Sequence, residues 1–339
     1  ACRDRALSPE HPVARGTSQN PDLFFQSREA SNPFYDAFPD VVQAAMDRFA
    51  KVTGRQYQTY EYIGSEKADK VVILMGSGAE TVEETVTYLN KSGATTGLLK
   101  VRLFRPFDAQ SLLDALPVSV DKIAVLDRTK EPGANGEPLY KDVSTALFQA
   151  SLAKNNQVTL DEKLSTPKTS LSKIIGGRFG LSSKEFTPAM VKAIFDELDK
   201  PQSKNLFTIG IVDDLTHTSL DYDPHFSIDA NAVNFQAGAV TISHLRFGPK
   251  PIHSAYEIQN NHANFIGCHQ PNFLKLYPML DKAAQGAILL LNTTASSEQA
   301  WDTFPTSVQQ QIIDKKINVH IIDAYKVARE AKLGKRINT

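Results

Sequence analysis

The sequence is poor in cysteine and contains no long apolar run. It has two cysteines in 339 residues, Cys2 and Cys268, and no Cys-x-x-Cys pair. Two cysteines do not make a disulfide framework, so a reducing, cytoplasmic setting is the simpler interpretation. They are also too few to ligate an iron–sulfur cluster, which takes four thiolates. No apolar run reaches the roughly 18 residues that a membrane-spanning helix needs.

The net charge of the chain gives no argument for binding to nucleic acid or to a membrane. There are 37 Lys and Arg residues against 38 Asp and Glu residues, which gives a formal net charge of -1. A near-neutral chain carries no electrostatic footprint for nucleic acid or for a membrane surface. The first residues, ACRDRALSPEHP, lack the apolar stretch of a signal peptide. The chain does not begin with Met, so we expect a fragment or a processed subunit, although a cloning choice would look the same.

Three apolar runs in the first half of the chain are separated by amphipathic segments. The runs KVVILMG, TGLLKVRLF and KIAVLD are predicted strands, at residues 70–76, 96–104 and 122–127. The segments TVEETVTYLNKSG and DAQSLLDAL have helical spacing, and a further helix is expected near 141–152. Alternation of strands with helices predicts an α/β fold with a doubly wound, mostly parallel sheet.

A second α/β unit of the same class is predicted from residue 205 to residue 339. Its expected strands are 206–214, 237–248, 263–269, 286–292 and 317–323. Its expected helices are 270–283, 297–315 and 324–333. The polar segment PQSKN, just before the first of these strands, is the candidate linker between the two units.

The first 60 residues are rich in proline, asparagine and aromatic residues. The Asn-Pro pairs at 20–21 and 32–33 are turn signals, and a helical pattern follows that ends at Gly54. So few apolar residues cannot form a core alone, so this segment is predicted to be the end of a larger domain. The predicted organisation is therefore 1–60, 61–200 and 205–339.

The segment MGSGAET, residues 75–81, follows the first predicted strand. In a doubly wound fold, ligands bind beyond the carboxyl ends of the strands. Backbone N–H groups of a glycine-rich turn that leads into a helix can hold an anion, which makes Ser77 and Gly78 candidate cofactor-binding residues. The segment is not a complete GxGxxG motif, and no Walker pattern is present. A plain tight turn explains it equally well.

The loop VLDRTKEPGANGEPLY, residues 125–140, follows the third predicted strand. Arg128 and Lys130 are candidates to bind a carboxylate or a phosphate. Alternatively, Asp127 and Glu131 pair with them in a salt-bridged exit loop. The second interpretation is the simpler one, because runs of charged residues are usually solvated.

Three other strand ends carry polar residues. In IVDDLTHTSL, Asp213 and Asp214 point to opposite sides if the strand continues, so an Asx or Ser/Thr turn is favoured over a metal site. His244 and Arg246 end another predicted strand and are kept as ligand candidates. Cys268 is expected to be a buried structural residue. The chain has no GxSxG and no HExxH motif, so we assign no catalytic residue and no metal ligand.

Several long segments in one order carry a family resemblance. They are RGTSQNPDLFFQSREASNPFY, GSGAETVEETVTYLN, LLKVRLFRPF, KIAVLDRTKEPGANGEPLY, IIGGRFGLSSKEFTPAMVKAIFDEL, FTIGIVDDLTHTSL and VTISHLRFGPKPI. Over nearly the whole chain they resemble pyruvate:ferredoxin (flavodoxin) oxidoreductases. The resemblance implies an enzyme that decarboxylates pyruvate on thiamine diphosphate. Electrons then pass through iron–sulfur clusters to ferredoxin or flavodoxin, and the acetyl group goes to coenzyme A.

The same resemblance assigns a role to each part of the chain. Residues 1–60 resemble the end of the thiamine-binding domain, 61–200 a domain similar to the C-terminal domain of transketolases, and 205–339 the gamma-subunit-like domain that helps to bind coenzyme A. His244 and Arg246 would then lie near the coenzyme A face. The family carries a glycine-rich segment with an Ala-Asn-Lys-Asn-Ser stretch before VTISHLRFG. Here only DYDPHFSIDANAVNFQAGA precedes it, so the third domain is shortened.

We therefore expect a portion of such an oxidoreductase that is inactive alone and holds none of these cofactors by itself. Its expected partners are the remaining domains of the enzyme and, through them, ferredoxin or flavodoxin. The complete enzyme is expected to be a homodimer, with no nucleic-acid or membrane partner. An alternative is a non-catalytic assembly domain, such as that of a sulfite reductase flavoprotein. A third possibility is a free-standing protein that binds acyl-coenzyme A.

Overall fold

A computed structural model of the chain describes residues 8–10, 18–154, 171–211, 214–228, 232–237, 241–248, 252 and 255–331. The chain divides into two units. The first consists of Ala1–Thr59 with Leu103–Asp108, and the second of Tyr60–Arg102 with Ala109–Thr339. Among the described residues, no helix is long and apolar enough to cross a lipid bilayer.

The described part of the first unit contains three helices: α1 (Pro21–Glu29), α2 (Asn32–Asp36) and α3 (Phe38–Thr53). The Asn-Pro pairs that indicated turns lie instead at the starts of α1 and α2. Proline suits the first helical turn because its φ is already near the helical value. The side chain of Asn20 caps α1 by accepting a hydrogen bond from Leu23 N at 2.8 Å. The predicted stop at Gly54 is confirmed, with a left-handed φ of 73°.

The first sheet has seven strands in the order β1-β3-β2-β4-β5-β6-β7. Their bounds are β1 Tyr60–Gly64, β2 Lys70–Met75, β3 Thr96–Val101, β4 Lys122–Asp127, β5 Lys173–Arg178, β6 Phe207–Ile209 and β7 Ser219–Leu220. Only β1 runs antiparallel to its neighbour, and the other pairs of this sheet are parallel. The predicted doubly wound, mostly parallel sheet is therefore confirmed.

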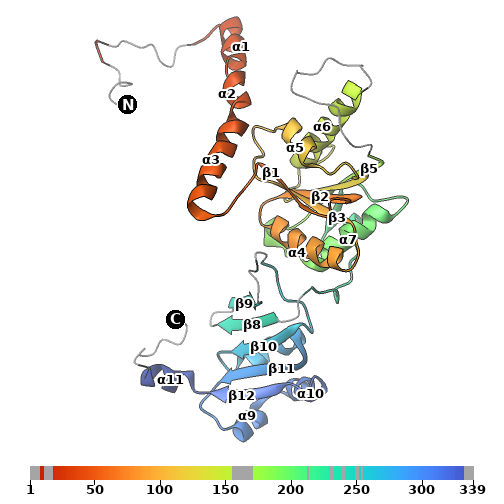
Figure 1. The fold of residues 1–339 in the computed structure, drawn as a ribbon. Coiled ribbons are helices and arrows are strands. Elements are labelled where there is room, and N and C mark those ends of the chain that lie inside the picture. The colour runs from red at the N-terminus through yellow and green to blue at the C-terminus, as the bar shows by residue number, and fades with distance from the viewer. Residues whose placement is uncertain are drawn as a thin grey trace. The chain divides into compact units, whose positions relative to one another are not determined.

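Helices cover both faces of this sheet (Figure 1). On one face lie α4 (Gly78–Lys91) and α7 (Pro188–Asp199), and on the other lie α5 (Ala109–Ala115) and α6 (Pro138–Lys154). Covered on both sides, the central strands are buried along almost their whole length. This is why they read as continuous apolar runs and not as alternating ones.

The strand predicted at 206–214 belongs to the first sheet. The sequence placed it at the start of the second unit, but β6 pairs in parallel with β5, and β7 pairs with β6. An apolar run indicates a strand but does not identify its partner, because pairing is decided by contacts far apart in the chain.

A second sheet has the order β12-β11-β10-β8-β9. Its strands are β8 Ala232–Ala237, β9 Thr241–Arg246, β10 Ala263–Cys268, β11 Ala283–Asn292 and β12 Asn318–Ile322. The pairs β8–β10, β10–β11 and β11–β12 are parallel, whereas β8 and β9 are antiparallel. The strand predicted over 237–248 corresponds to β9, but Ala237 at its predicted start belongs to the antiparallel strand β8, which was not predicted.

The helices of the second sheet are α8 (Phe273–Leu276), α9 (Ser297–Thr303), α10 (Thr306–Asp314) and α11 (Ala324–Glu330). The single helix expected over 297–315 is two helices, because Pro305 stands between α9 and α10. The helix expected over 270–283 is the short α8 followed by a 3-10 turn. These elements pack around a core separate from that of the first sheet.

Candidate functional site

The strand order of the first sheet reverses between β2 and β4. The chain leaves β2 toward β3 on one side and leaves β4 toward β5 on the other. Such a switch point is where open α/β sheets bind ligands, beyond the carboxyl ends of the strands. Ser77 and Gly78 follow β2, Arg128 follows β4, and all three line one cavity of about 230 Å³, here called the Ser77 cavity. Lys130 lines a neighbouring cavity instead.

Gly78 has a packing role at this point. A Cβ atom at Gly78 would lie 2.7 Å from Cε2 of the Phe179 ring, closer than such contacts allow. Glycine therefore lets this ring pack against the first turn of α4. Two backbone N–H groups of that turn donate local hydrogen bonds, Ala79 N to Gly76 O at 3.1 Å and Glu80 N to Ser77 O at 3.2 Å.

The loop after β4 is held largely by its own carboxylates. Asp127, only 2% exposed, accepts hydrogen bonds from Leu139 N at 2.9 Å and Tyr140 N at 3.1 Å. It thereby satisfies two N–H groups in the first turn of α6. Burial raises the pKa of the Asp127 carboxyl group, and these two hydrogen bonds oppose the rise.

Glu137 is the second carboxylate that fixes this loop, and it is also 2% exposed. It lies 3.2 Å from Arg178 Nη1 and 3.6 Å from Lys130 Nζ, and it accepts a hydrogen bond from Glu131 N at 2.7 Å. Arg128 Nε donates to Gly180 O at 2.8 Å. The loop is thus internally salt-bridged, while Arg128 and Lys130 also line cavities.

Sequence reasoning missed the segment that these cavities share, the loop from Phe179 to Thr187 between β5 and α7. Gly180, Ser182 and Ser183 have left-handed φ angles of 63°, 53° and 59°. Left-handed backbone costs a residue with a side chain about 1–2 kcal/mol. Such strain persists where the surrounding structure enforces it, and it clusters at functional sites. Glycine at 180 is compatible with such a conformation, but the sequence carried no signal for the two serines.

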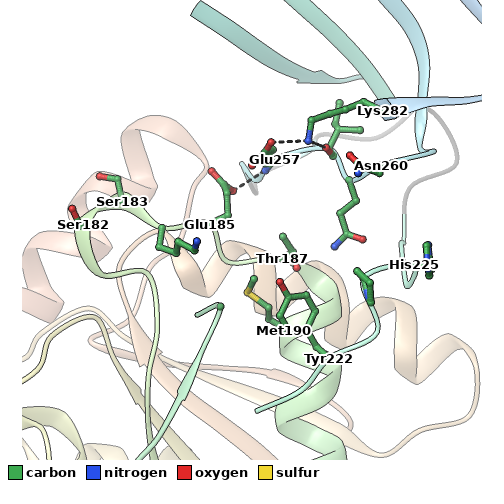
Figure 2. A pocket seen from close by; sticks show the side chains of 15 residues that line it. Ser182, Ser183, Glu185, Thr187, Met190, Tyr222, His225, Glu257, Asn260 and Lys282 are labelled. Atoms are coloured by element: carbon green, nitrogen blue, oxygen red, sulfur yellow. Dashed lines mark hydrogen bonds and ion pairs between the residues drawn. The ribbon is translucent and has the colours of Figure 1, made fainter. Parts of the chain in front are cut away.

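The largest cavity along this loop has a volume of about 620 Å³ (Figure 2). Lys282 Nζ donates to Glu257 Oε1 at 2.7 Å, and Glu257 N donates to the Glu185 carboxylate at 2.8 Å. Figure 2 shows these three side chains together at one end of the cavity. Within the described part of the chain, the buried oxygens Thr187 Oγ1 and Gln259 Oε1 have no hydrogen-bond partner. Both residues line this cavity.

Comparison with known proteins identifies the family. The model of pyruvate:ferredoxin oxidoreductase core domain II matches residues 68–168, and that of pyruvate ferredoxin/flavodoxin oxidoreductase matches 225–339. The chain belongs to the pyruvate:ferredoxin/flavodoxin oxidoreductase family. It is similar along its whole length to pyruvate-flavodoxin oxidoreductases of Nostoc sp. (49% identity) and Rhodospirillum rubrum (48%), and to a putative one of Synechocystis sp. (47%). The chain spans 30–31% of the length of these relatives.

The alignment with the Nostoc oxidoreductase runs over 378 positions, whereas this chain has 339 residues. Thirty-nine positions of that relative therefore have no counterpart here. The loop between β5 and α7 lies outside both matched ranges of the oxidoreductase family, so neither family model covers it.

The second pair of predicted residues lies elsewhere in this oxidoreductase portion. On β9, His244 Nδ1 accepts a hydrogen bond from Ile258 N at 3.2 Å, and burial lowers the pKa of its ring. Arg246 Nη2 is 2.7 Å from Glu84, and its guanidinium group stacks 4.3 Å from the centre of the Tyr256 ring. Neither His244 nor Arg246 is among the residues that line the cavities described above.

Two further predictions concern single side chains. The Asp214 carboxylate accepts hydrogen bonds from Thr216 N at 3.0 Å and Ser219 N at 2.7 Å, which is the predicted Asx turn. Asp213 lies outside the described residues. Cys268 is buried as expected, its thiol donates to Gln270 O, and burial raises its pKa to about 11. No group of three or more His, Cys, Asp or Glu side chains in the described ranges is placed to hold a metal ion.

Proposed function

We propose that this chain is an internal portion of an enzyme that oxidatively decarboxylates pyruvate to acetyl-coenzyme A and reduces ferredoxin or flavodoxin. The observation that carries the proposal is 45–49% identity along the entire chain to six relatives named for this chemistry. The relatives are about three times longer, so the portion is inactive without their other domains. These domains are its partners in a cytoplasmic enzyme that assembles as a homodimer.

Within that enzyme the chain acts chiefly as a scaffold. We assign residues 1–60 to the end of the thiamine-binding domain, the residues from 61 to about 220 to the transketolase-like domain and the residues after about 220 to the gamma-like domain. The helices α1 to α3 contain no buried residue, which supports assigning them to a domain that lies mostly outside this chain. The pairing of β6 and β7 with β5 supports placing the boundary between the last two domains after residue 220.

We assign the cofactors of the complete enzyme to different parts of it. Two cysteines do not fit an iron–sulfur cluster, and one of them, Cys268, is buried with a thiol that resists ionisation. We therefore assign the clusters to domains outside this chain, and thiamine diphosphate to the thiamine-binding domain, of which this chain contains only the end. For coenzyme A we retain His244 and Arg246, which lie two residues apart on β9 and so share one side of the strand. Ser77, Gly78, Arg128 and Lys130 remain the candidates for an anion-binding surface.

A hybrid enzyme tests the proposed activity. The matching segment of the Nostoc relative is replaced by this chain, and pyruvate- and coenzyme A-dependent reduction of methyl viologen is measured. We expect turnover from the hybrid and none from the isolated chain. The control is the relative cut and rejoined at the same two junctions. A folded, cofactor-loaded hybrid without turnover would instead favour the non-catalytic assembly domain, which the relatives reported above do not support.

A second hybrid tests the shortened segment. It restores the positions of the relative that have no counterpart in this chain. If only this hybrid is active, the shortening has removed a function that the rest of the chain retains. Calorimetric titration of coenzyme A into this second hybrid measures binding with the other domains present, since the isolated chain is expected to hold no coenzyme A by itself. His244→Ala and Arg246→Ala should each weaken this binding, and unchanged affinity in both variants would reject these two residues.

A further inference from the structure

We propose that a cavity beyond the carboxyl ends of β5 and β6 binds a small amphiphilic anion, with an oxyanion head and a short apolar body. Its lining consists of Lys130, Arg178, Phe179, Gly180, Leu181, Lys184, Thr208, Ile209, Gly210 and Ile211. We call it the β5–β6 cavity. All of these residues belong to the first sheet or to the loops that leave its strands. Its volume of about 480 Å³ lies in the range of small-molecule sites.

The charge of the lining favours an anion. Lys130, Arg178 and Lys184 line the cavity, and no described Asp or Glu does. Glu137, which does not line the cavity, pairs with two of these cations, at 3.6 Å from Lys130 and 3.2 Å from Arg178. The lining itself therefore carries an excess of positive charge. A carboxylate or phosphate group of a ligand would neutralise part of this excess.

Arg178 is fixed in place before any ligand arrives. It is 7% exposed, its Nη1 is paired with Glu137, and its Nη2 donates to Leu206 O. Its Nε is buried and has no partner within the described residues. A buried guanidinium group with an unsatisfied N–H is costly, and an anion in the adjacent cavity would lower that cost through its charge. Arg178 therefore contributes a preorganised positive charge.

The lining also contains four apolar side chains. Phe179 and Ile209 are buried, whereas Leu181 and Ile211 are 41% and 42% exposed at the same cavity. An aliphatic body seated there would remove these exposed side chains from water. Gly180 also lines the cavity and has no side chain, so a ligand can approach the backbone there. A lining that contains both cations and apolar side chains favours an amphiphilic ligand over inorganic phosphate.

Three probes of matched chemistry test the proposal by calorimetry on the purified chain. Hexanoate has the head and the body, acetate has only the head, and hexylamine has the body with the opposite charge. We expect hexanoate to bind at least about tenfold more tightly than acetate, because burial of even half of its four additional methylene groups supplies that factor. Hexylamine should show no binding. Equal affinity for hexanoate and hexylamine, or no binding of any probe, would overturn the proposal.

Substitutions assign the binding to this cavity. Lys130→Gln and Lys184→Gln each remove one charge from partly or fully exposed side chains, so both variants should fold. We expect each to weaken hexanoate binding by about tenfold, as for a lost charge-assisted hydrogen bond. Lys192→Gln on α7 is the matched control, because Lys192 pairs with Asp196 and does not line the cavity. Weaker hexanoate binding in the control, or unchanged hexanoate binding in both cavity variants, would place the probe elsewhere.

This inference does not depend on the activity proposed above, since it concerns binding by the isolated chain. A hybrid enzyme without turnover would leave the hexanoate titration unaffected. Conversely, an active hybrid whose chain binds no probe would reject the cavity ligand alone. Ile211→Asn adds a further distinction, because it removes apolar surface without changing charge. It should weaken hexanoate binding and leave acetate binding unchanged, and the opposite pattern would contradict the assigned roles.

Discussion

Replacing Glu137 by glutamine should destabilise the first sheet selectively. The carboxylate of Glu137 is 2% exposed and faces Arg178, which is 7% exposed. Glutamine preserves the shape and an oxygen that can accept the hydrogen bond from Glu131 N. It removes the charge that compensates a buried guanidinium group. Breaking a buried ion pair from one side costs about 3–5 kcal/mol.

We take the lower end of that range, because glutamine still offers Arg178 a neutral acceptor. For a domain of this size, about 3 kcal/mol lowers the unfolding temperature by roughly 6–12 °C. The two sheets have separate cores, so they need separate probes. The chain has one tryptophan, Trp301, and it packs against the core of the second sheet. Trp301 fluorescence therefore follows the second sheet, and far-ultraviolet circular dichroism follows both.

The expected result for Glu137→Gln is an earlier first transition by circular dichroism and an unchanged tryptophan transition. Glu131→Gln is the control, since Glu131 is an exposed carboxylate of the same loop, paired with the exposed Lys141. Exposed pairs contribute little, so this control should leave both transitions in place. An unchanged first transition in Glu137→Gln, or an equal shift in the control, would refute the assignment of Glu137 as the compensating charge.

Three further outcomes follow from single residues. Gly78→Ala should lower the stability of the first sheet by about 1–3 kcal/mol in urea unfolding, because its Cβ would overlap the Phe179 ring; no loss would contradict the packing role. The pKa of Asp127 is raised in the folded state, so protonation favours folding: from neutral pH down to its ordinary value near 3.8, the wild type should gain stability relative to Asp127→Asn. A flat difference across that pH range would refute the raised pKa. In a Cys2→Ser background, Cys268 should react with a thiol-exchange reagent only after denaturation, because its pKa is about 11; rapid labelling of the folded chain would contradict its burial.

The elements that sequence predicted best are those whose signal is local. The runs that became β2, β3 and β4 are apolar because helices cover both faces of the sheet, and this composition is visible without any partner. The partner of β6 was not visible, since its pairing with β5 joins segments about 30 residues apart. The reversal of direction between β8 and β9 was missed because no proline and no hairpin dipeptide such as Asn-Gly stands between the two strands in the sequence.

At the candidate site, too, the sequence predicted what depends on neighbouring residues and missed what depends on residues far apart in the chain. A strand-end rule was enough to bring Ser77, Gly78 and Arg128 to one cavity, because carboxyl ends of parallel strands share one edge of the sheet. The rule did not show which of these residues packs against the fold and which is available to a ligand. The packing contact of Gly78 depends on a ring about 100 residues away in sequence, and the compensating role of Glu137 depends on Arg178 in the next strand. Contacts of this kind have no signature in a single sequence.

The loop between β5 and α7 connects the strain in the backbone with the cavities around it. Ser182 and Ser183 are left-handed, and a loop that served only as a connection would reduce this cost with glycine or asparagine. The conformation is instead supported by two contacts at the start of the loop, where it leaves β5. Arg128 holds the carbonyl of Gly180, and the ring of Phe179 is locked under α4 by the absence of a side chain at Gly78. Serine hydroxyl groups are thereby placed at the rims of two cavities, where glycine would provide no hydrogen-bonding group. Contacts at the start of the loop thus accompany the strain, and the two strained serines line cavities beside the sheet.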